Sequence, residues 1–291
     1  MKNPLSSHYS EEEHRKLIKE CLDGSRDSLD RLVRLHQPFI YNVAWKMAHN
    51  PNDAMDLTQE VLIKVITKLS QFKFNSSFRT WLYRIVVNEF LQSKRRQGEA
   101  RFTSFDDMIK QLDAIPNAEL NKEEEIELQE VSREMQIRCM SGMLMCLNRE
   151  QRLIYILGDT FGIDHKLGAD LFNTSPQNFR VKLHRARKDL YNYMDDKCGL
   201  VKKSNPCRCP KKAKSLIKMG VLDKENLQYN ISYKHRIAQY VEEEHEKVKS
   251  EISEYTDLYR GHATKEDFDK DTFIEQIVAD KIFMNYFKPP N

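Results

Sequence analysis

The stretch ADLFNTSPQNFRVKL, residues 169–183, decides how the second half of this chain folds. Ala169 is small enough to let two helices cross closely, and Asn173 tolerates the left-handed conformation that ends a helix. Ser175 has the hydroxyl that caps a following helix, and the proline after it suits the first helical position. Phe179 then returns an apolar side chain to the core. This spacing predicts a helix-turn-helix.

The second helix of this motif is rich in side chains that contact DNA. Gln and Asn can read adenine with two hydrogen bonds, Arg can read guanine, and other cations hold phosphates. The alternative is an ordinary solvated helix face, which is what charged runs usually form. The turn and the cationic helix together favour DNA binding. The side chains concerned are Gln177, Asn178, Arg180, Lys182, His184, Arg185, Arg187 and Lys188.

The composition indicates a soluble helical chain. It has 291 residues, 31% of them charged, with nine Gly and nine Pro, and its apolar residues recur at spacings of three and four. These features predict an all-α fold of two or three small domains. The net charge of only +3 indicates that charge is sorted into segments. No apolar run has membrane-spanning length and the N-terminus lacks an export signal, so we expect no membrane insertion and a cytoplasmic location.

The first predicted domain covers residues 10–98, where apolar side chains hold a helical period. One of its helices restarts at Pro51 and carries an acidic strip away from its apolar stripe. The strip consists of Asp53, Asp56, Gln59 and Glu60. Taken alone, it is best explained by solubility.

Residues 72–84, FKFNSSFRTWLYR, mix aromatic side chains with cations. An unpaired nucleic-acid strand needs this combination, because bases stack on aromatic rings at about 1 to 3 kcal/mol each while cations neutralise phosphates. The alternative is that the rings are mostly core, and the spacing alone does not choose between them. The rings concerned are Phe72, Phe78, Trp81 and Tyr83. The helix that follows ends in the basic residues 94–96, which suit a DNA backbone.

Residues 99–125 contain Asp106, Asp107, Pro116 and the start of an acidic run from Glu119 to Glu130, which predict a flexible, negative linker that ends in a helix. This linker would join the first domain to a second small helical domain, residues 126–196, which contains the helix-turn-helix. A C-terminal extension, residues 197–291, would hold a cysteine cluster followed by two or three helices.

Three cysteines begin this extension, namely Cys198, Cys207 and Cys209. Two thiols one residue apart and a third nearby can ligate zinc in a structural site, but a closed site needs a fourth ligand, for which His184 or His235 is only a guess. A reduced, metal-free loop explains the pattern equally well, since Cys-x-Cys alone is weak. The other cysteines, Cys21, Cys139 and Cys146, are expected to be plain buried thiols.

Two stretches of the chain resemble one family, the bacterial sigma factors of the extracytoplasmic-function type. The first comprises DAMDLTQEV (53–61), FRTWLYRIVVN (78–88) and KRR (94–96), and the second runs from 147 to 190 with EQR at 150–152 and LHRAR at 183–187. The resemblance covers about residues 10–195. Leu167 and Gly168 depart from the family's usual acidic and aliphatic pair, and Gly168 weakens its helix by about 1 kcal/mol relative to Ala.

The resemblance implies a partner for each surface. The acidic strip would dock on the clamp of the largest RNA polymerase subunit, which replaces the solubility interpretation, and the core flap would be a second contact. The opened minus-10 strand would meet Phe72, Ser76, Ser77, Arg79, Trp81, Arg84, Asn88, Lys94, Arg95 and Arg96. Minus-35 duplex would meet the helix-turn-helix residues given above together with Ser175, Pro176 and Val181. The acidic linker would thread the transcript channel.

The resemblance therefore implies a non-enzymatic factor that binds RNA polymerase core and directs promoter-specific initiation. The alternative from a different class is a stand-alone helix-turn-helix regulator that binds duplex DNA without polymerase. A zinc-dependent nuclease is a third hypothesis, although no paired carboxylates, nucleophile with a base or glycine-rich phosphate loop favour catalysis. The apolar C-terminal segment can cover the other domains or bind a separate regulatory protein such as an anti-sigma factor.

Overall fold

The computed structural model describes residues 10–93, 104–224 and 227. All the secondary-structure elements of these residues are helices. One isolated backbone bridge pairs Cys198 with Cys207. The predicted all-α fold is therefore confirmed. Lys94, Arg95 and Arg96, His235 and the helices expected in the extension beyond residue 227 lie outside the described residues.

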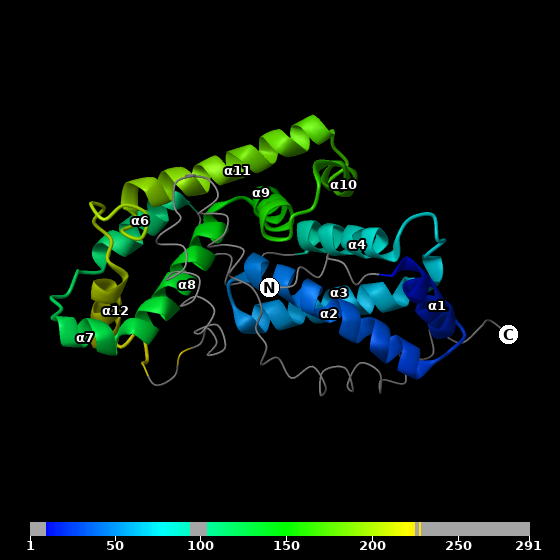
Figure 1. Cartoon of the computed structure of the whole chain (residues 1–291), viewed down its shortest axis with the longest axis horizontal. Coiled ribbons are helices and arrows are strands. Elements are labelled where there is room, and N and C mark those ends of the chain that lie inside the picture. Colours follow the sequence, from blue (N-terminus) through cyan, green and yellow to red (C-terminus); the bar gives the residue numbers. More distant parts are fainter. Residues whose placement is uncertain (1–9, 94–103, 225–226, 228–291) are drawn as a thin grey trace.

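The first half forms a bundle of α1 (Glu11–Leu22), α2 (Arg26–Ala48), α3 (Pro51–Thr67) and α4 (Phe78–Gln92), with a short 3-10 turn η1 (Leu69–Gln71) between the last two. Each helix begins with a polar side chain that accepts a hydrogen bond from a backbone amide of its first turn, which satisfies a donor without a partner inside the helix. These capping residues are Ser10, Ser25, Asn50 and Ser77. Figure 1 shows α1 to α4 gathered on one side of the molecule.

The segment predicted to be a flexible linker differs from that prediction, because its described part contains helix α6 (Phe105–Ala114). Ser104 caps α6 and Met108 is buried at 2% exposure. The carbonyls of Leu112 and Ile115, at the end of α6, accept hydrogen bonds from the Lys212 ammonium. The acidic composition predicted a flexible segment. The segment instead contains an amphipathic helix whose last carbonyls accept hydrogen bonds from Lys212, about a hundred residues later in the chain.

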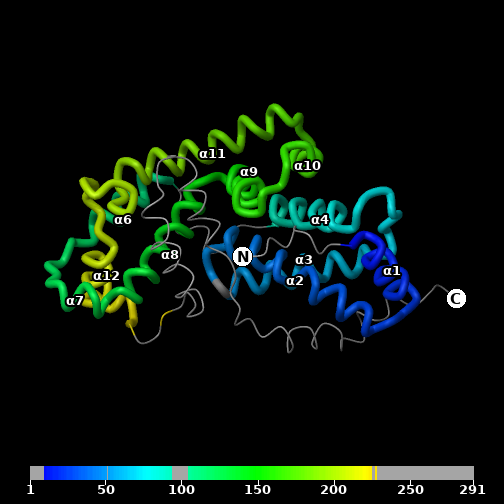
Figure 2. Tube along the Cα trace, viewed as in Figure 1, coloured from blue at the N-terminus to red at the C-terminus, as the bar shows by residue number. Residues whose placement is uncertain are grey.

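The rest of the described chain contains α7 (Lys122–Glu127), α8 (Gln129–Cys146), α9 (Arg149–Tyr155), a π turn η2 (Ile156–Thr160), α10 (His165–Leu171), α11 (Pro176–Lys197) and α12 (Cys209–Lys218). In Figure 2, α11 runs past α9 and α6, and α12 lies beside α8. Leu216 and Ala213 of α12 are buried with Val131 and Met135 of α8. The start of the extension therefore packs as part of the second helical unit.

One hydrophobic core runs through both predicted domains, from Ile18 of α1 to Met194 of α11. Phe39 of α2 illustrates the continuity, since its ring centroid lies 4.4 Å from that of Tyr83 and 5.0 Å from that of Phe161. The two units are thus packed against each other along α2 and α4. No helix in the described ranges has the length and apolarity needed to cross a lipid bilayer.

Candidate nucleic-acid interface

The turn between α10 and α11 has the local geometry that the sequence predicted. Asn173 adopts the left-handed conformation with φ of 48°, and Thr174 N donates to the Ala169 carbonyl at 2.9 Å. Ser175 then caps α11 by accepting from Asn178 N at 3.1 Å. Because the cap and the left-handed residue fix the chain direction, the first turn of α11 is presented to solvent.

The two helices meet through Gly168 and Phe179, and this contact explains a glycine in the middle of α10. The Phe179 ring is fully buried. A Cβ atom placed on Gly168 would lie 2.4 Å from Cζ of that ring, far inside contact distance. Gly168, which by helix propensity weakens α10, therefore leaves the space that the Phe179 ring occupies.

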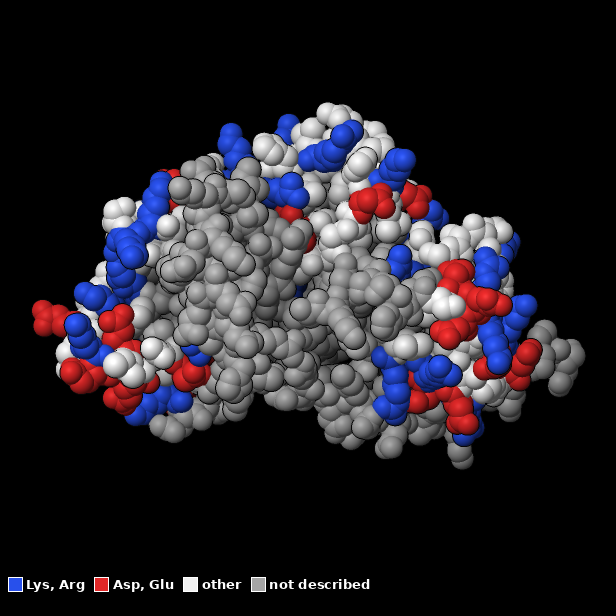
Figure 3. Space-filling model, in the orientation of Figure 1, with Lys and Arg blue, Asp and Glu red and all other residues white. Residues whose placement is uncertain are grey.

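The solvent side of α11 carries most of the predicted DNA-binding residues. The exposed ones are Ser175, Pro176, Gln177, Asn178, Arg180, His184, Arg185 and Lys188, while Val181 is half-buried. Figure 3 shows Lys and Arg side chains along this edge of the molecule, over α11. Cationic side chains and the amides of Gln177 and Asn178 thus lie on the exposed side of one helix.

Two of the predicted phosphate-binding cations are instead engaged within the protein. Lys182 Nζ lies 2.5 Å from the Glu150 carboxylate. Arg187 donates to both oxygens of Asp159 at 2.8 and 2.7 Å, and Asp159 is fully buried in the π turn. The hydrogen bond that Arg187 donates to Asp159 raises the pKa of the Arg187 guanidinium above its ordinary value. Arg187 therefore neutralises a buried carboxylate, a role that the sequence interpretation missed because the two residues lie 28 positions apart.

The aromatic segment is mostly core, which decides between the two explanations left open by its spacing. Phe72 is 4% exposed, so the expectation that its ring meets DNA is wrong. Its ring centroid lies 5.4 Å from that of the half-buried Trp81 and 5.5 Å from that of Phe78, and Phe78 lies 5.5 Å from Trp81, so the three rings form one cluster. Trp81 is the ring of this group that remains partly accessible.

The polar residues around Trp81 stay near the surface. Ser76, Ser77 and Arg79 are half-buried, and Asn88 is exposed. Ser77 accepts a hydrogen bond from Thr80 N at 3.0 Å and so begins α4. The loop and the first turns of α4 thus place polar groups beside one aromatic edge.

Arg84, another predicted DNA-binding residue, joins the two units. Its guanidinium lies 2.7 and 2.6 Å from the two carboxylate oxygens of Asp170 on α10. Both side chains are about half exposed, so the pair is worth only about 0 to 1 kcal/mol. No pattern in the sequence indicated this partner, which lies 86 residues away.

The acidic strip of α3 lies on the side opposite its buried stripe. Asp56 and Gln59 are exposed and Asp53 and Glu60 are half-buried, whereas Leu57 on the same helix is fully buried. The structure therefore brings these four side chains to one surface of α3.

Arg152 is a structural residue whose role the sequence did not reveal. Its guanidinium is fully buried and donates to the carbonyls of Leu144 at 2.8 Å, Met47 at 2.7 Å, and Met145 and Leu147, both at 3.1 Å. Met47 belongs to α2, so Arg152 ties the first unit to the second.

The three cysteines of the extension lie along one cavity of about 320 Å³, and Cys139 of α8 lies there with them. A hydrogen bond from Cys209 lowers the pKa of the Cys207 thiol to about 7. Burial raises the pKa values of Cys139 and Cys198. As the described side chains stand, no three His, Cys, Asp or Glu residues form a group that holds a metal ion. His184, guessed as a fourth ligand, is instead exposed on α11.

Residues 32–100 match region 2 of the sigma-70 family. The chain is 30% identical over 168 residues to the ECF RNA polymerase sigma factor SigE of Mycolicibacterium smegmatis, covering 57% of this chain and 62% of the relative. It is 27% identical over 169 residues to the RNA polymerase sigma factor YlaC of Bacillus subtilis, covering 58% and 93%. The ECF RNA polymerase sigma-E factor of Escherichia coli K12 is 25% identical over 179 residues, covering 60% and 91%.

The matched region 2 contains α3 and α4, which carry the acidic strip and the aromatic loop. The alignments to the relatives extend over 57 to 60% of this chain, well beyond the length of region 2 alone. The chain is therefore similar to RNA polymerase sigma factors of the extracytoplasmic-function type, in its region 2 and over 168 to 179 residues of its length.

Proposed function

We propose that this protein is a promoter-recognition subunit that binds RNA polymerase core and directs promoter-specific transcription initiation. The observation that carries this proposal is the succession of a sigma-70 region 2 at residues 32–100 and, further along the chain, a cationic helix α11 presented by a capped left-handed turn. A region that captures an opened strand and a later helix that reads duplex DNA are the two recognition elements that initiation needs. The protein itself has no catalytic role in this proposal.

The surfaces divide the work among partners. The acidic strip Asp53, Asp56, Gln59 and Glu60 docks on the largest-subunit clamp of core polymerase, and the second unit contacts the flap. Ser76, Ser77, Arg79, Trp81, Arg84 and Asn88, with the basic residues 94–96, capture the minus-10 strand. Removing a base from the stack costs a few kcal/mol, and the accessible edge of Trp81 offsets part of that cost.

The minus-35 element is read in the major groove by the exposed side of α11. Gln177, Asn178 and Arg180 lie in its first turns, where a recognition helix meets base edges. His184, Arg185 and Lys188 lie further along and suit the phosphate backbone. Because the protein acts on polymerase and DNA, we place it in the cytoplasm, where a regulatory protein such as an anti-sigma factor can compete for the same surfaces.

In this proposal, Arg84 exchanges its partner Asp170 for a DNA phosphate when the promoter is captured. Asp170 engages Nη2 of Arg84, so this nitrogen can bind a minus-10 phosphate only after it leaves the carboxylate. Since an exposed pair is worth about 0 to 1 kcal/mol, a DNA phosphate can replace the carboxylate at little cost. The packed arrangement of α4 against α10 is thus compatible with exchange on promoter binding.

Transcription with purified polymerase tests the proposal. Core enzyme lacking its own specificity subunit is mixed with the full chain and genomic DNA, and the transcripts are sequenced. We expect initiation at discrete positions that share an upstream and a minus-10 element. Binding to duplex DNA without core and no new transcripts with core would support the stand-alone regulator instead and reject the proposal.

Arg180→Ala should weaken recognition of one upstream base pair by about 1 to 3 kcal/mol, because an Arg in the major groove forms two hydrogen bonds with guanine. Run-off transcription from promoters that differ at single upstream positions measures this loss. Arg31→Ala is the matched control, since Arg31 is exposed on α2, away from α11. An unchanged order of promoter preference in the Arg180 variant would contradict its placement at a base.

A further inference from the structure

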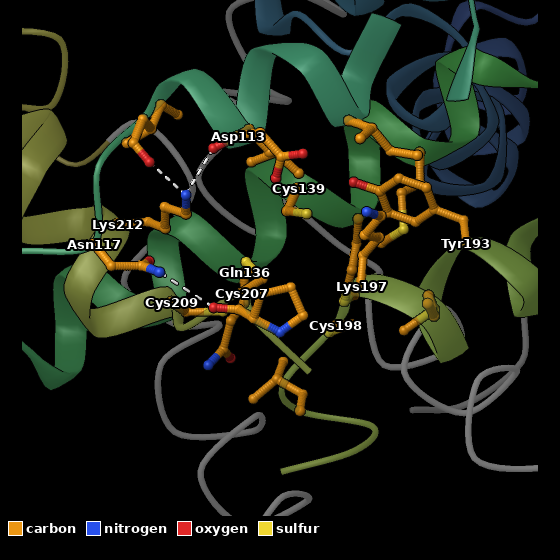
Figure 4. Close-up of a pocket in the computed structure, with 18 of the residues that line it drawn as sticks. Asp113, Asn117, Gln136, Cys139, Tyr193, Lys197, Cys198, Cys207, Cys209 and Lys212 are labelled. Atoms are coloured by element: carbon orange, nitrogen blue, oxygen red, sulfur yellow. Dashed lines mark hydrogen bonds between the residues drawn. The ribbon is translucent and has the colours of Figure 1, made fainter. Parts of the chain in front are cut away.

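Four of the six cysteines line the cavity of about 320 Å³ beside α6, α8, the end of α11 and the start of α12. They come from three separate segments: Cys139 lies on α8, Cys198 directly follows α11, and Cys207 and Cys209 lie just before and at the start of α12. Figure 4 shows these side chains around the same space. Cys21 and Cys146 do not line this cavity. The fold thus sorts the thiols into one group.

Hydrogen bonds fix the backbone of the loop from Cys198 to Cys209. The Asn205 side-chain amide donates to the carbonyls of Asp195 at 2.7 Å and Cys198 at 3.0 Å. Cys207 N donates to the Lys197 carbonyl at 3.3 Å, which sets Cys198 and Cys207 side by side. A Cβ on Gly199 would lie 2.2 Å from the Cys207 carbonyl oxygen, so the two chain segments are in closest contact there.

Positive charge surrounds the thiols. Lys197 and Lys212 line the cavity, and the Arg208 guanidinium is held by the carbonyls of Lys203, Asn205 and Cys207. Lys212 donates to the carbonyl of Leu112 at 2.7 Å, which fixes its ammonium at the wall. A zinc ion with four thiolates carries a net charge of −2, and it needs such cations when it is buried.

We propose that Cys139, Cys198, Cys207 and Cys209 bind one zinc ion in a structural site. Four sulfur ligands in a tetrahedron are typical of structural zinc, and they leave no open position for catalysis. Cys139 is the fourth ligand that the spacing of the other three could not supply. As they stand the thiols do not form a metal-binding group, so in this proposal their side chains change rotamer when zinc binds, and the thiol protons are released.

Zinc at this position ties the extension to the second helical unit. Cys139 lies on α8, and α12 packs on the same helix through Ala213 and Leu216. The zinc–sulfur bonds would therefore strengthen the apolar contact between α8 and α12. Removal of the ion should let α12 unfold locally before the rest of the protein.

The test measures metal in the reduced full-length chain. We expect about one zinc per chain by elemental analysis, and cobalt(II) added to the metal-free protein should give the absorption bands of a tetrahedral tetrathiolate site. Cys139→Ser should bind zinc at least about tenfold more weakly, because losing even a residue that only hydrogen-bonds to a metal ligand weakens metal binding by about 10- to 100-fold. Cys146→Ser, a cysteine replaced on the same helix outside the cavity, should bind like the wild type.

Circular dichroism of each variant checks that α-helix content is kept. If Cys139→Ser does not fold, Cys207→Ser and the cobalt spectrum of the wild type carry the test. A wild-type chain that takes up neither zinc nor cobalt overturns the proposal, as does iron in place of zinc. A Cys139→Ser protein with the full tetrathiolate spectrum overturns the assignment of Cys139. None of these outcomes depends on transcription, so they are distinguishable from failure of the proposed function.

Discussion

Replacing Arg152 by alanine should lower the free energy of unfolding by at least about 3 kcal/mol, one of the two largest effects that we expect on the stability of this protein. Its side chain is fully buried and bonds four backbone carbonyls. Each buried acceptor left without a donor costs about 1 to 3 kcal/mol, and the lost volume adds a cavity. Removing Arg152 also unties Met47 of α2 from the turn before α9.

Urea unfolding followed by circular dichroism measures the effect. Arg149→Ala is the matched control, because Arg149 lies one turn earlier on α9 and is half-buried with bonds to Ser93. We expect it to cost only about 1 kcal/mol. Arg152→Met keeps most of the volume but cannot donate, so it should still lose most of the stability. Equal effects of the Arg149 and Arg152 substitutions would show that the four carbonyls contribute little.

Arg152 also shows which features the sequence could predict. An arginine near the start of a short helix is usually exposed, and the partner that makes this one structural lies 105 residues earlier. Lys182 and Arg187 belong to the same case, since their carboxylate partners lie 32 and 28 residues away. Long-range partners of this kind leave no periodic pattern in the sequence. Their contribution to the free energy of unfolding depends on the packed structure.

Local features were predicted well for the opposite reason. The left-handed Asn173 and the Ser175 cap depend on neighbours within five residues, so the chemistry of the turn is written in one stretch. Helical period likewise gave the all-α fold. The prediction for Phe72 was wrong because an aromatic ring next to cations is compatible both with a place in the core and with stacking on a base. Only the burial of the ring in the folded structure distinguishes the two. Cys139 could not be joined to a cluster that begins 59 residues later, at Cys198.

Phe179→Ala should cost about 3 to 5 kcal/mol, because the ring is fully buried where α11 crosses α10. Its neighbour Gly168 makes the effect distinctive. In the wild type, Gly168→Ala forces a Cβ to within 2.4 Å of the ring and should destabilise by about 1 to 3 kcal/mol, despite the higher helix propensity of Ala.

In the Phe179→Ala background the same Gly168→Ala change should become favourable by about 1 kcal/mol, since the Cβ then enters space that the ring has left and the helix gains propensity. Urea unfolding of the four proteins gives the coupling free energy directly. A coupling near zero would mean that the ring moves aside freely and that the glycine has another cause. If the effect of Gly168→Ala on the free energy of unfolding changes sign in this background, Gly168 and Phe179 form one fitted pair. The glycine that weakens α10 by itself is then what allows α11 to pack against α10.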